Sequence, residues 1–126
     1  MEWEFSFIND GIIKVKTKGD FSLDDFQKMI VQMFSDSRWV PGMNRLYDNR
    51  ELNIKATDIN TMYNIGMIQK VFEEKIGRGR LALLVKDVSD YGSGQLYQNV
   101  VNGRIESEVK IFISYDEAME WVKQTE

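Results

Sequence analysis

Polar side chains that could do chemistry gather in two stretches of the sequence, Asp48-Asn49-Arg50 and the segment from Asp87 to Ser93. As a candidate ligand or interaction site we single out five of them: Asp48, Arg50, Asp87, Ser89 and Tyr91. An arginine guanidinium binds carboxylates and phosphates through two parallel hydrogen bonds. Arg50 could therefore hold an anion, or it could pair with a nearby aspartate and merely stiffen the loop. We favour the ion pair.

The second stretch allows two further interpretations. Asp87 and Asp90 could form a carboxylate pair or a weak cation site, but a metal ion needs more converging oxygen ligands than the sequence places there. Gly92-Ser93-Gly94 could cradle a phosphate at a helix N-terminus. It lacks the lysine and the spacing of a P-loop, so an ordinary turn is the preferred prediction. We predict no metal and no cofactor.

The composition removes the commonest catalytic groups, because the chain has no cysteine and no histidine. Disulfides, thiol nucleophiles and thiolate metal sites are excluded, and so is the usual general base near neutral pH. An enzyme would need Asp48, Arg50, Asp87 or Tyr91 to converge in one cleft with shifted pKa values. We therefore predict that the protein is not an enzyme and has no catalytic residues.

Length and charge narrow the class further. The 126 residues fit one domain, 1–126, and the net charge of −4 argues against nucleic acid and against anionic membrane surfaces as partners. No apolar run reaches 18 residues, which predicts no membrane span. The first four residues are acidic rather than basic, unlike a signal peptide, so we expect a cytoplasmic protein.

One stretch organises the fold, the apolar run between Arg80 and Lys86. A run this short with no alternation is typical of an inner strand covered on both faces of a sheet. Two strands with alternating patterns precede it at the N-terminus, joined by a hairpin turn at Asn9-Asp10-Gly11. The second strand has a lysine face (Lys14, Lys16, Lys18), for which a solvated role is favoured over a binding role.

The remaining elements follow from periodicity and capping residues. We expect helices over 22–35, beginning at Ser22, over 57–76, beginning at Thr57 or Asp58, over the segment after Gly94, and after Ser114. Strands are expected at 44–48 and 109–113. Trp39 is expected to pack under the turn that contains Pro41, in preference to facing a ligand. The order β-β-α-β-α-β-α-β-α predicts an α/β domain with a mixed five-stranded sheet and about four helices, on both faces or crowded on one.

With this order, nearly the whole chain resembles the SpoIIAA-like branch of the STAS domains. The resemblance rests on the Ser22-capped helix, on Trp39-Val40-Pro41-Gly42 leading to Leu46-Tyr47-Asp48-Asn49-Arg50, on the Arg80–Lys86 strand and on the ending Val109 to Val122. It implies a small non-enzymatic domain, often dimeric, used for regulation or ligand binding. By the same resemblance, Thr57 takes the place of a phosphorylated serine, and related lipid-binding domains suggest a small apolar ligand.

The helix over 57–76 has more apolar residues than one buried stripe requires. Met62, Tyr63 and Met67 are therefore our candidate interface, with ordinary core packing or a ligand cavity as alternatives for the methionines. The leading hypothesis is a regulatory or protein-interaction module that forms a homodimer or binds a protein partner. The alternative is a carrier of a small apolar ligand, which predicts a closed pocket of roughly a few hundred Å³. A site, if present, is expected between the exits of the 44–48 and 80–86 strands.

Overall fold

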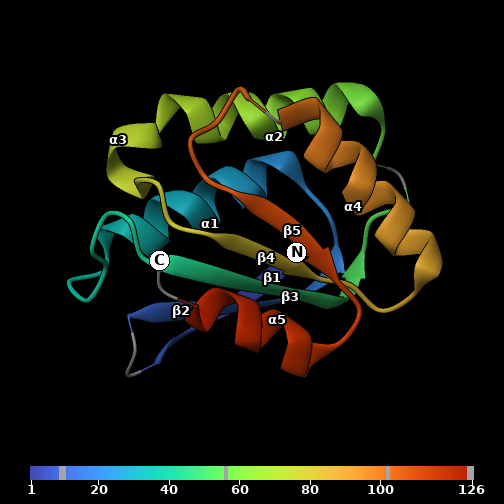
Figure 1. Ribbon diagram of the computed structural model, residues 1–126. Coiled ribbons are helices and arrows are strands. Elements are labelled where there is room, and N and C mark those ends of the chain that lie inside the picture. Colours follow the sequence, from blue (N-terminus) through green and yellow to red (C-terminus); the bar gives the residue numbers. More distant parts are fainter. Residues whose placement is uncertain (9–10, 56, 102, 125–126) are drawn as a thin grey trace.

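The computed structural model describes residues 1–8, 11–55, 57–101 and 103–124, and its centre is a five-stranded sheet in which the strands lie side by side in chain order (Figure 1). They are β1 (Glu2–Ile8), β2 (Ile12–Asp20), β3 (Asn44–Asn53), β4 (Leu81–Leu84) and β5 (Val109–Phe112). β1 is antiparallel to β2, and the other neighbours are parallel. The predicted mixed sheet is confirmed.

The helices are distributed unequally over the two faces of the sheet. α1 (Leu23–Ser35), α2 (Ile59–Val71) and α4 (Val88–Val101) cover one face, whereas α5 (Tyr115–Lys123) covers the other and packs on β3, β4 and β5 (Figure 1). Successive right-handed crossovers that advance along a sheet in one direction place their helices on the same face. α5 follows the last strand, so no crossover constrains it, and it covers the opposite face.

β4 is the inner strand that its apolar run predicts. All four of its residues are buried, and it pairs in parallel with both β3 and β5. Leu81 and Leu83 belong to the large core beneath α1, α2 and α4, whereas Ala82 and Leu84 belong to the smaller core beneath α5. This alternation explains why the run is apolar without interruption.

α1, α2 and α5 each begin at a side chain that accepts a backbone N–H of the first turn. The Ser22 hydroxyl accepts from the amide of Asp25 and the Ser114 hydroxyl from that of Glu117, each at 3.3 Å, as predicted. The carboxylate of Asp58 accepts from Thr61 at 2.8 Å, so Asp58, not Thr57, caps α2. Such caps satisfy amides that have no partner within the helix.

Three boundaries differ from the prediction. The strand expected at 44–48 continues to Asn53. The expected 57–76 helix is interrupted at Phe72, whose ring packs on Phe34 at 5.1 Å, and a one-turn helix α3 (Glu73–Ile76) follows. The segment 87–94 is not a turn, because α4 begins at Val88 and includes Gly92-Ser93-Gly94. Gly94 is where the helix approaches β5: a Cβ at Gly94 would lie 2.9 Å from Cγ2 of Ile111. The glycines in this segment misled the sequence interpretation.

Two smaller predictions concern the lysine face and Trp39. Lys16 and Lys18 are exposed and form ion pairs with Glu51 (3.1 Å) and Glu2 (3.7 Å), which is a solvated face. The indole of Trp39 is buried and donates to the carbonyl oxygen of Lys75 at 2.8 Å, as expected for packing beneath the turn. In the predicted hairpin turn, Asn9 and Asp10 lie outside the described residues, and Gly11 has a φ of +72°.

Candidate functional site

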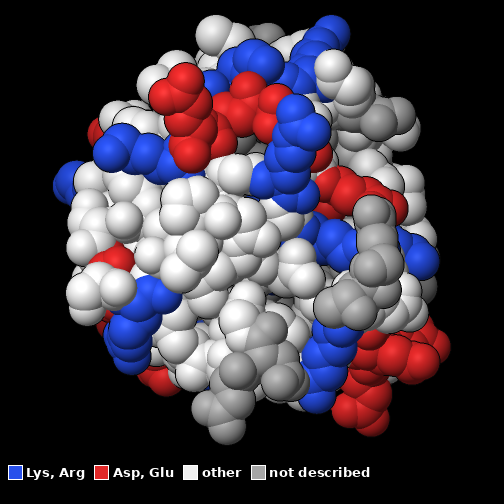
Figure 2. Space-filling model, turned by 60° about the vertical axis from the view of Figure 1, so that its left-hand side comes forward, with Lys and Arg blue, Asp and Glu red and all other residues white. Residues whose placement is uncertain are grey.

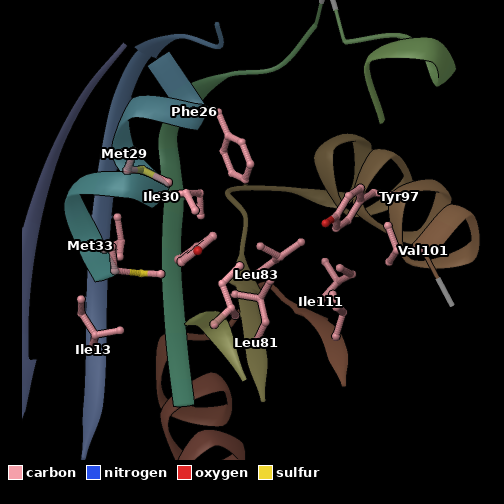
Figure 3. Packing of buried hydrophobic residues seen from close by; sticks show 14 of the residues in the cluster. Ile13, Phe26, Met29, Ile30, Met33, Leu81, Leu83, Tyr97, Val101 and Ile111 are labelled. Atoms are coloured by element: carbon pink, nitrogen blue, oxygen red, sulfur yellow. The ribbon is translucent and has the colours of Figure 1, made fainter. Parts of the chain in front are cut away.

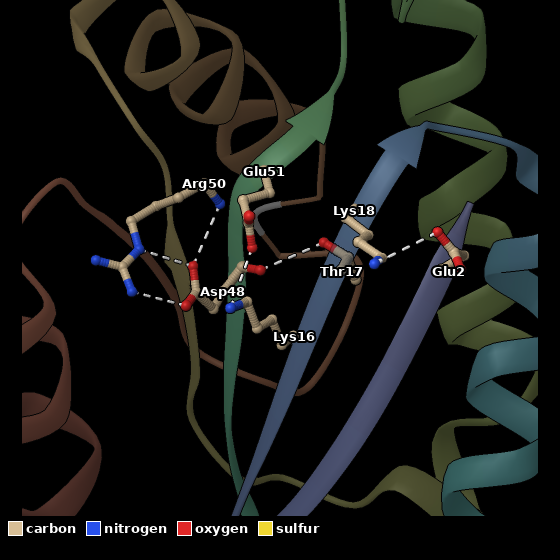
Figure 4. Close-up of polar contacts among 7 residues, drawn as sticks. All are labelled: Glu2, Lys16, Thr17, Lys18, Asp48, Arg50 and Glu51. Atoms are coloured by element: carbon tan, nitrogen blue, oxygen red, sulfur yellow. Dashed lines mark hydrogen bonds and ion pairs between the residues drawn. The ribbon is translucent and has the colours of Figure 1, made fainter.

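The pair Asp48–Arg50 is part of the fold. Asp48 is buried on the face of β3 toward α5 and accepts hydrogen bonds from Arg50 at both carboxylate oxygens, from Nε at 2.9 Å and from Nη2 at 2.8 Å (Figure 4). The backbone amide of Arg50 adds a third bond at 3.3 Å. This is the predicted ion pair rather than an open anion site, but it lies within β3 and not in a loop.

The pKa of Asp48 depends on two opposing effects, burial and these hydrogen bonds. Burial raises the pKa of this carboxyl, but the hydrogen bonds from Arg50 and the positive charges of Arg50 and Lys14 outweigh it, so the pKa lies below its ordinary value. Asp48 is therefore a carboxylate at neutral pH with its oxygens already in use, which makes it a poor general base.

The other three predicted site residues belong to α4 or its start. The carboxylate of Asp87 accepts the amide of Asp90 at 3.0 Å and so caps the helix. Ser89 is exposed, and the hydroxyl of Tyr91 accepts a hydrogen bond from Gln95 at 3.1 Å. No hydrogen bond or ion pair between described residues links these three to Asp48 or Arg50. The structure also gives less support to the two alternatives for this stretch. Asp90, considered for a carboxylate pair or cation site, lies 3.7 Å from the ammonium group of Lys86. Gly92-Ser93-Gly94, considered for a phosphate site, lies inside the helix and not at its start.

A cavity of about 90 Å³ lies between the sheet and the helices α1, α2 and α4. Phe26 of α1 and Tyr97 of α4 point toward one another across the space above Leu83 of β4 (Figure 3). Met29 and Met62 also line it, so these two methionines are core residues at a cavity wall. The cavity lies between the exits of β3 and β4, but none of the five predicted site residues lines it. It is smaller than the pocket expected of a lipid carrier.

Polar groups that sequence reasoning missed stand at this cavity. Tyr47 of β3, Gln69 of α2 and Tyr97 of α4 all line it and are all buried. The amide of Gln69 donates to the Tyr97 hydroxyl, whereas the Tyr47 hydroxyl has no hydrogen-bond partner among the described residues. Burial raises the pKa of the Tyr97 hydroxyl well above its usual range, and the nearby Tyr47 adds to that effect.

Arg45 is the second group that the sequence analysis passed over. It lies two residues before Tyr47 on β3, is 0% exposed, and places its guanidinium carbon 5.9 Å from the centre of the Tyr47 ring. The available signal was its position, since a strand next to the inner strand of a sheet covered on both faces tends to be buried.

Thr57, the candidate phosphorylation site, has its hydroxyl oxygen turned inward. That atom is buried, has no partner among the described residues, and lies at the edge of the cavity. A kinase would reach it only if the connection between β3 and α2 opened. Phosphorylation of Thr57 remains a prediction.

The candidate interface divides into one buried and two exposed residues. Met62 points into the core, whereas Tyr63 and Met67 are exposed on the outer surface of α2. They belong to a row of exposed apolar side chains at four-residue spacing, which we call the α2 ridge: Ile59 (47% exposed), Tyr63 (42%), Met67 (62%) and Val71 (73%).

Charged side chains do not segregate by sign on the face in Figure 2, where Lys and Arg are interspersed with Asp and Glu around uncharged surface. A continuous basic surface of the kind that binds nucleic acid is not present in this view. Among the helices of the described residues, none combines the length and the apolar character needed to cross a bilayer.

The fold of the chain is SpoIIAA-like. Among solved structures, the chain is similar to an uncharacterised protein of the DUF3478 family with a SpoIIAA-like fold from Shewanella loihica PV-4. The two are 16% identical, the match covers 96% of this chain and 92% of that chain, and the TM-score is 0.62. At this identity the likeness shows the fold alone. No protein-family model and no curated protein matches the sequence.

Proposed function

We propose that this chain is a non-enzymatic, STAS-like interaction module that forms a homodimer through the α2 ridge. The ridge is the observation that carries the proposal, because four apolar side chains in one row remain exposed to water on a single helix. The surroundings of the candidate catalytic groups support the non-enzymatic part of this proposal. Asp48 is held by Arg50, and Asp87 caps α4, so neither carboxylate is available as a base.

A second copy of the chain is the partner that suits this surface best. Lys70 is the only charged residue of α2, and it is paired with Glu73 at 2.9 Å. In a twofold interface each residue meets its own copy or a close neighbour of it, so charged side chains would repel. Two uncharged ridges avoid this repulsion, although each protomer has a net charge of −4. Rows at four-residue spacing interdigitate with helix axes crossing at about −50°.

The size of the ridge predicts a weak dimer. Four half-exposed side chains offer an apolar area on the order of 400 Å² per protomer, about half of what a standard interface buries on each partner. We therefore expect association in the micromolar range or weaker, which would allow exchange between the homodimer and another protein that offers an apolar helix.

The test is sedimentation velocity over a concentration series with two matched variants. The wild-type mass is expected to rise from 14.7 kDa toward twice that value. Met67→Glu is expected to stay monomeric, because two buried glutamates would face each other across the interface. Val88→Glu is the control, since Val88 is at least as exposed but lies on α4. A wild-type protein that stays monomeric throughout would overturn the homodimer, as would equal effects of the two substitutions.

A second candidate function is the binding of a small apolar ligand, which the cavity beneath α1, α2 and α4 supports. Its walls are predominantly apolar, and three of the side chains in them are methionines (Met1, Met29 and Met62), which adapt readily to ligands of different shape. Native mass spectrometry of the freshly purified protein tests it: a co-purified small molecule is expected, and a clean apo mass counts against it.

A further inference from the structure

The cavity has a polar end that the packing of the core does not explain. Its walls are apolar (Phe21, Phe26, Met29, Met62, Leu81, Leu83), yet the hydroxyl of Tyr47 stands buried at it without a partner among the described residues. A buried hydroxyl that makes no hydrogen bond costs roughly 1–3 kcal/mol. A phenylalanine at position 47 would avoid this cost, so the packing of the core alone does not explain why position 47 is a tyrosine.

Arg45 presents the same problem in a stronger form. Its Nη2 donates to the Ser107 hydroxyl at 2.6 Å, but Nε and Nη1 are buried without partners. No carboxylate of the described residues lies within ion-pair distance of it. Burying an unpaired charge is far more costly than burying a hydroxyl. The guanidinium therefore lacks one negative charge and two hydrogen-bond acceptors.

These unsatisfied groups lie close to one another, although only Tyr47 lines the cavity. The Arg45 guanidinium lies against the Tyr47 ring at 5.9 Å, and its charge lowers the pKa of the Tyr97 hydroxyl against the larger effect of burial. Tyr97 and Gln69 come from α4 and α2, on the other side of the cavity from β3. Donors from the sheet and from two helices thus meet at the polar end, while no Asp, Glu, Lys or Arg side chain of the described residues lines the cavity itself.

We propose that the cavity binds a small apolar monocarboxylate, with its carboxylate on the Tyr47 hydroxyl, its charge balanced by Arg45 beside that ring, and its hydrocarbon part against Phe26, Met29 and Met62. One buried guanidinium balances one carboxylate in charge. A phosphate would bring surplus negative charge into a cavity that no Lys or Arg side chain of the described residues lines. The inference rests on the second candidate function above and adds to it the chemical class of the ligand.

The size of the cavity limits the hydrocarbon part. A cavity of about 150 Å³ holds benzene in another protein, and this one measures about 90 Å³. A chain of a few carbons therefore fits if the side chains of Met29 and Met62 shift, and a long-chain fatty acid does not.

The experiment compares hexanoate with hexanamide, which has nearly the same shape and no charge. With ¹³C-methyl methionine labels, the signals of Met29 and Met62 report on the cavity, and that of exposed Met67 is the internal control. Hexanoate is expected to shift the first two signals saturably, at least ten-fold more tightly than hexanamide, and to leave Met67 unchanged. Inorganic phosphate is expected to shift none of them.

Two variants locate the carboxylate. Tyr47→Phe removes only a hydroxyl without a partner, so it should fold with unchanged or higher stability and bind hexanoate at least five-fold more weakly. Arg45→Met should abolish the preference for hexanoate over hexanamide. Tyr115→Phe, on α5 at the opposite face of the sheet, is the control and should bind as the wild type does.

The outcomes separate the two proposals about the cavity. Equal binding of hexanoate and hexanamide would overturn the carboxylate while keeping the apolar carrier. No shift of Met29 or Met62 with either probe would overturn both. Unchanged binding by Tyr47→Phe and Arg45→Met would also overturn the assignment of the polar end.

Discussion

Arg45 and Asp48 are two buried charged residues of β3 that differ in how many hydrogen-bond partners the chain gives them. Asp48 lies on the α5 face of β3, and Arg50 satisfies both of its carboxylate oxygens from two residues away. Arg45 lies on the face toward α2 and α4 and receives one hydrogen-bond partner, Ser107. Asp48 is satisfied within the chain and so has a structural role. Arg45 lacks a counter-charge and two hydrogen-bond acceptors, and in our proposal a bound carboxylate supplies the counter-charge.

The same contrast separates the two cores. Beneath α5, the rings of Phe112 and Trp121 pack at 5.6 Å, and polar groups such as Asp48 are fully bonded. Beneath α1, α2 and α4 the core is larger and contains the cavity, with the partnerless hydroxyl of Tyr47.

The largest expected effect comes from removing the partner of Asp48. Arg50→Met leaves a carboxylate buried without its hydrogen bonds and should lower the free energy of unfolding by about 2–3 kcal/mol, less than for a fully buried pair because Arg50 is partly exposed. Arg45→Met removes a charge that has no ionic partner and should change the free energy by less than about 1 kcal/mol, or raise it.

Urea unfolding of the two variants at neutral pH measures this difference. Equal losses for Arg45→Met and Arg50→Met would mean that Arg45 is satisfied within the fold, and the contrast between the two charges would be wrong.

A smaller effect on the stability of the protein is expected at acidic pH. Because the pKa of Asp48 is lower in the folded than in the unfolded state, its contribution to stability is complete above the unfolded pKa of about 4 and is lost as the pH falls through the folded value. Asp48→Asn should therefore be less stable than the wild type at neutral pH and should lose less stability between neutral pH and acid. Thermal unfolding across that range measures it, and parallel curves for both proteins would contradict the role of the ion pair.

The smallest effect concerns the approach of α4 to β5. Gly94→Ala gains helix propensity of about 1 kcal/mol but places its methyl group 2.9 Å from Ile111, so a net loss of about 1 kcal/mol is expected. In an Ile111→Ala background the same change should become stabilising, because the methyl group then fills vacated space. Urea unfolding of the double-mutant cycle reports the coupling. Additive effects would mean that the helix can move away without cost.

The sequence predicts the elements best where pattern and capping agree. β4 has an unmistakable apolar run, and α1 and α5 combine amphipathic spacing with Ser22 and Ser114 at their starts. The predicted start of α4 was wrong because glycines such as Gly92 and Gly94 are typical of turns. Gly94 is instead required by a tertiary contact with Ile111, which no local pattern contains.

The five site residues chosen from the sequence remain a prediction, and the cavity is lined by other residues. Strand ends locate the space between β3 and β4, as they do in other open α/β sheets. Asp48 and Arg50 attract attention because they are polar and clustered, yet they satisfy each other. Arg45 and Tyr47 alternate with apolar neighbours on a strand, and only the three-dimensional structure shows which of their polar atoms have no partner.

The strand order of the sheet has a consequence for how the protein is made. Because β1 to β5 are adjacent in chain order, each strand adds to an edge formed by the strand before it, and none has to be inserted between two others. On the ribosome, where N-terminal segments emerge first, the sheet can grow strand by strand while the C-terminal part is still being synthesised. α5, which follows β5 in the chain, would then close the remaining face of β3, β4 and β5.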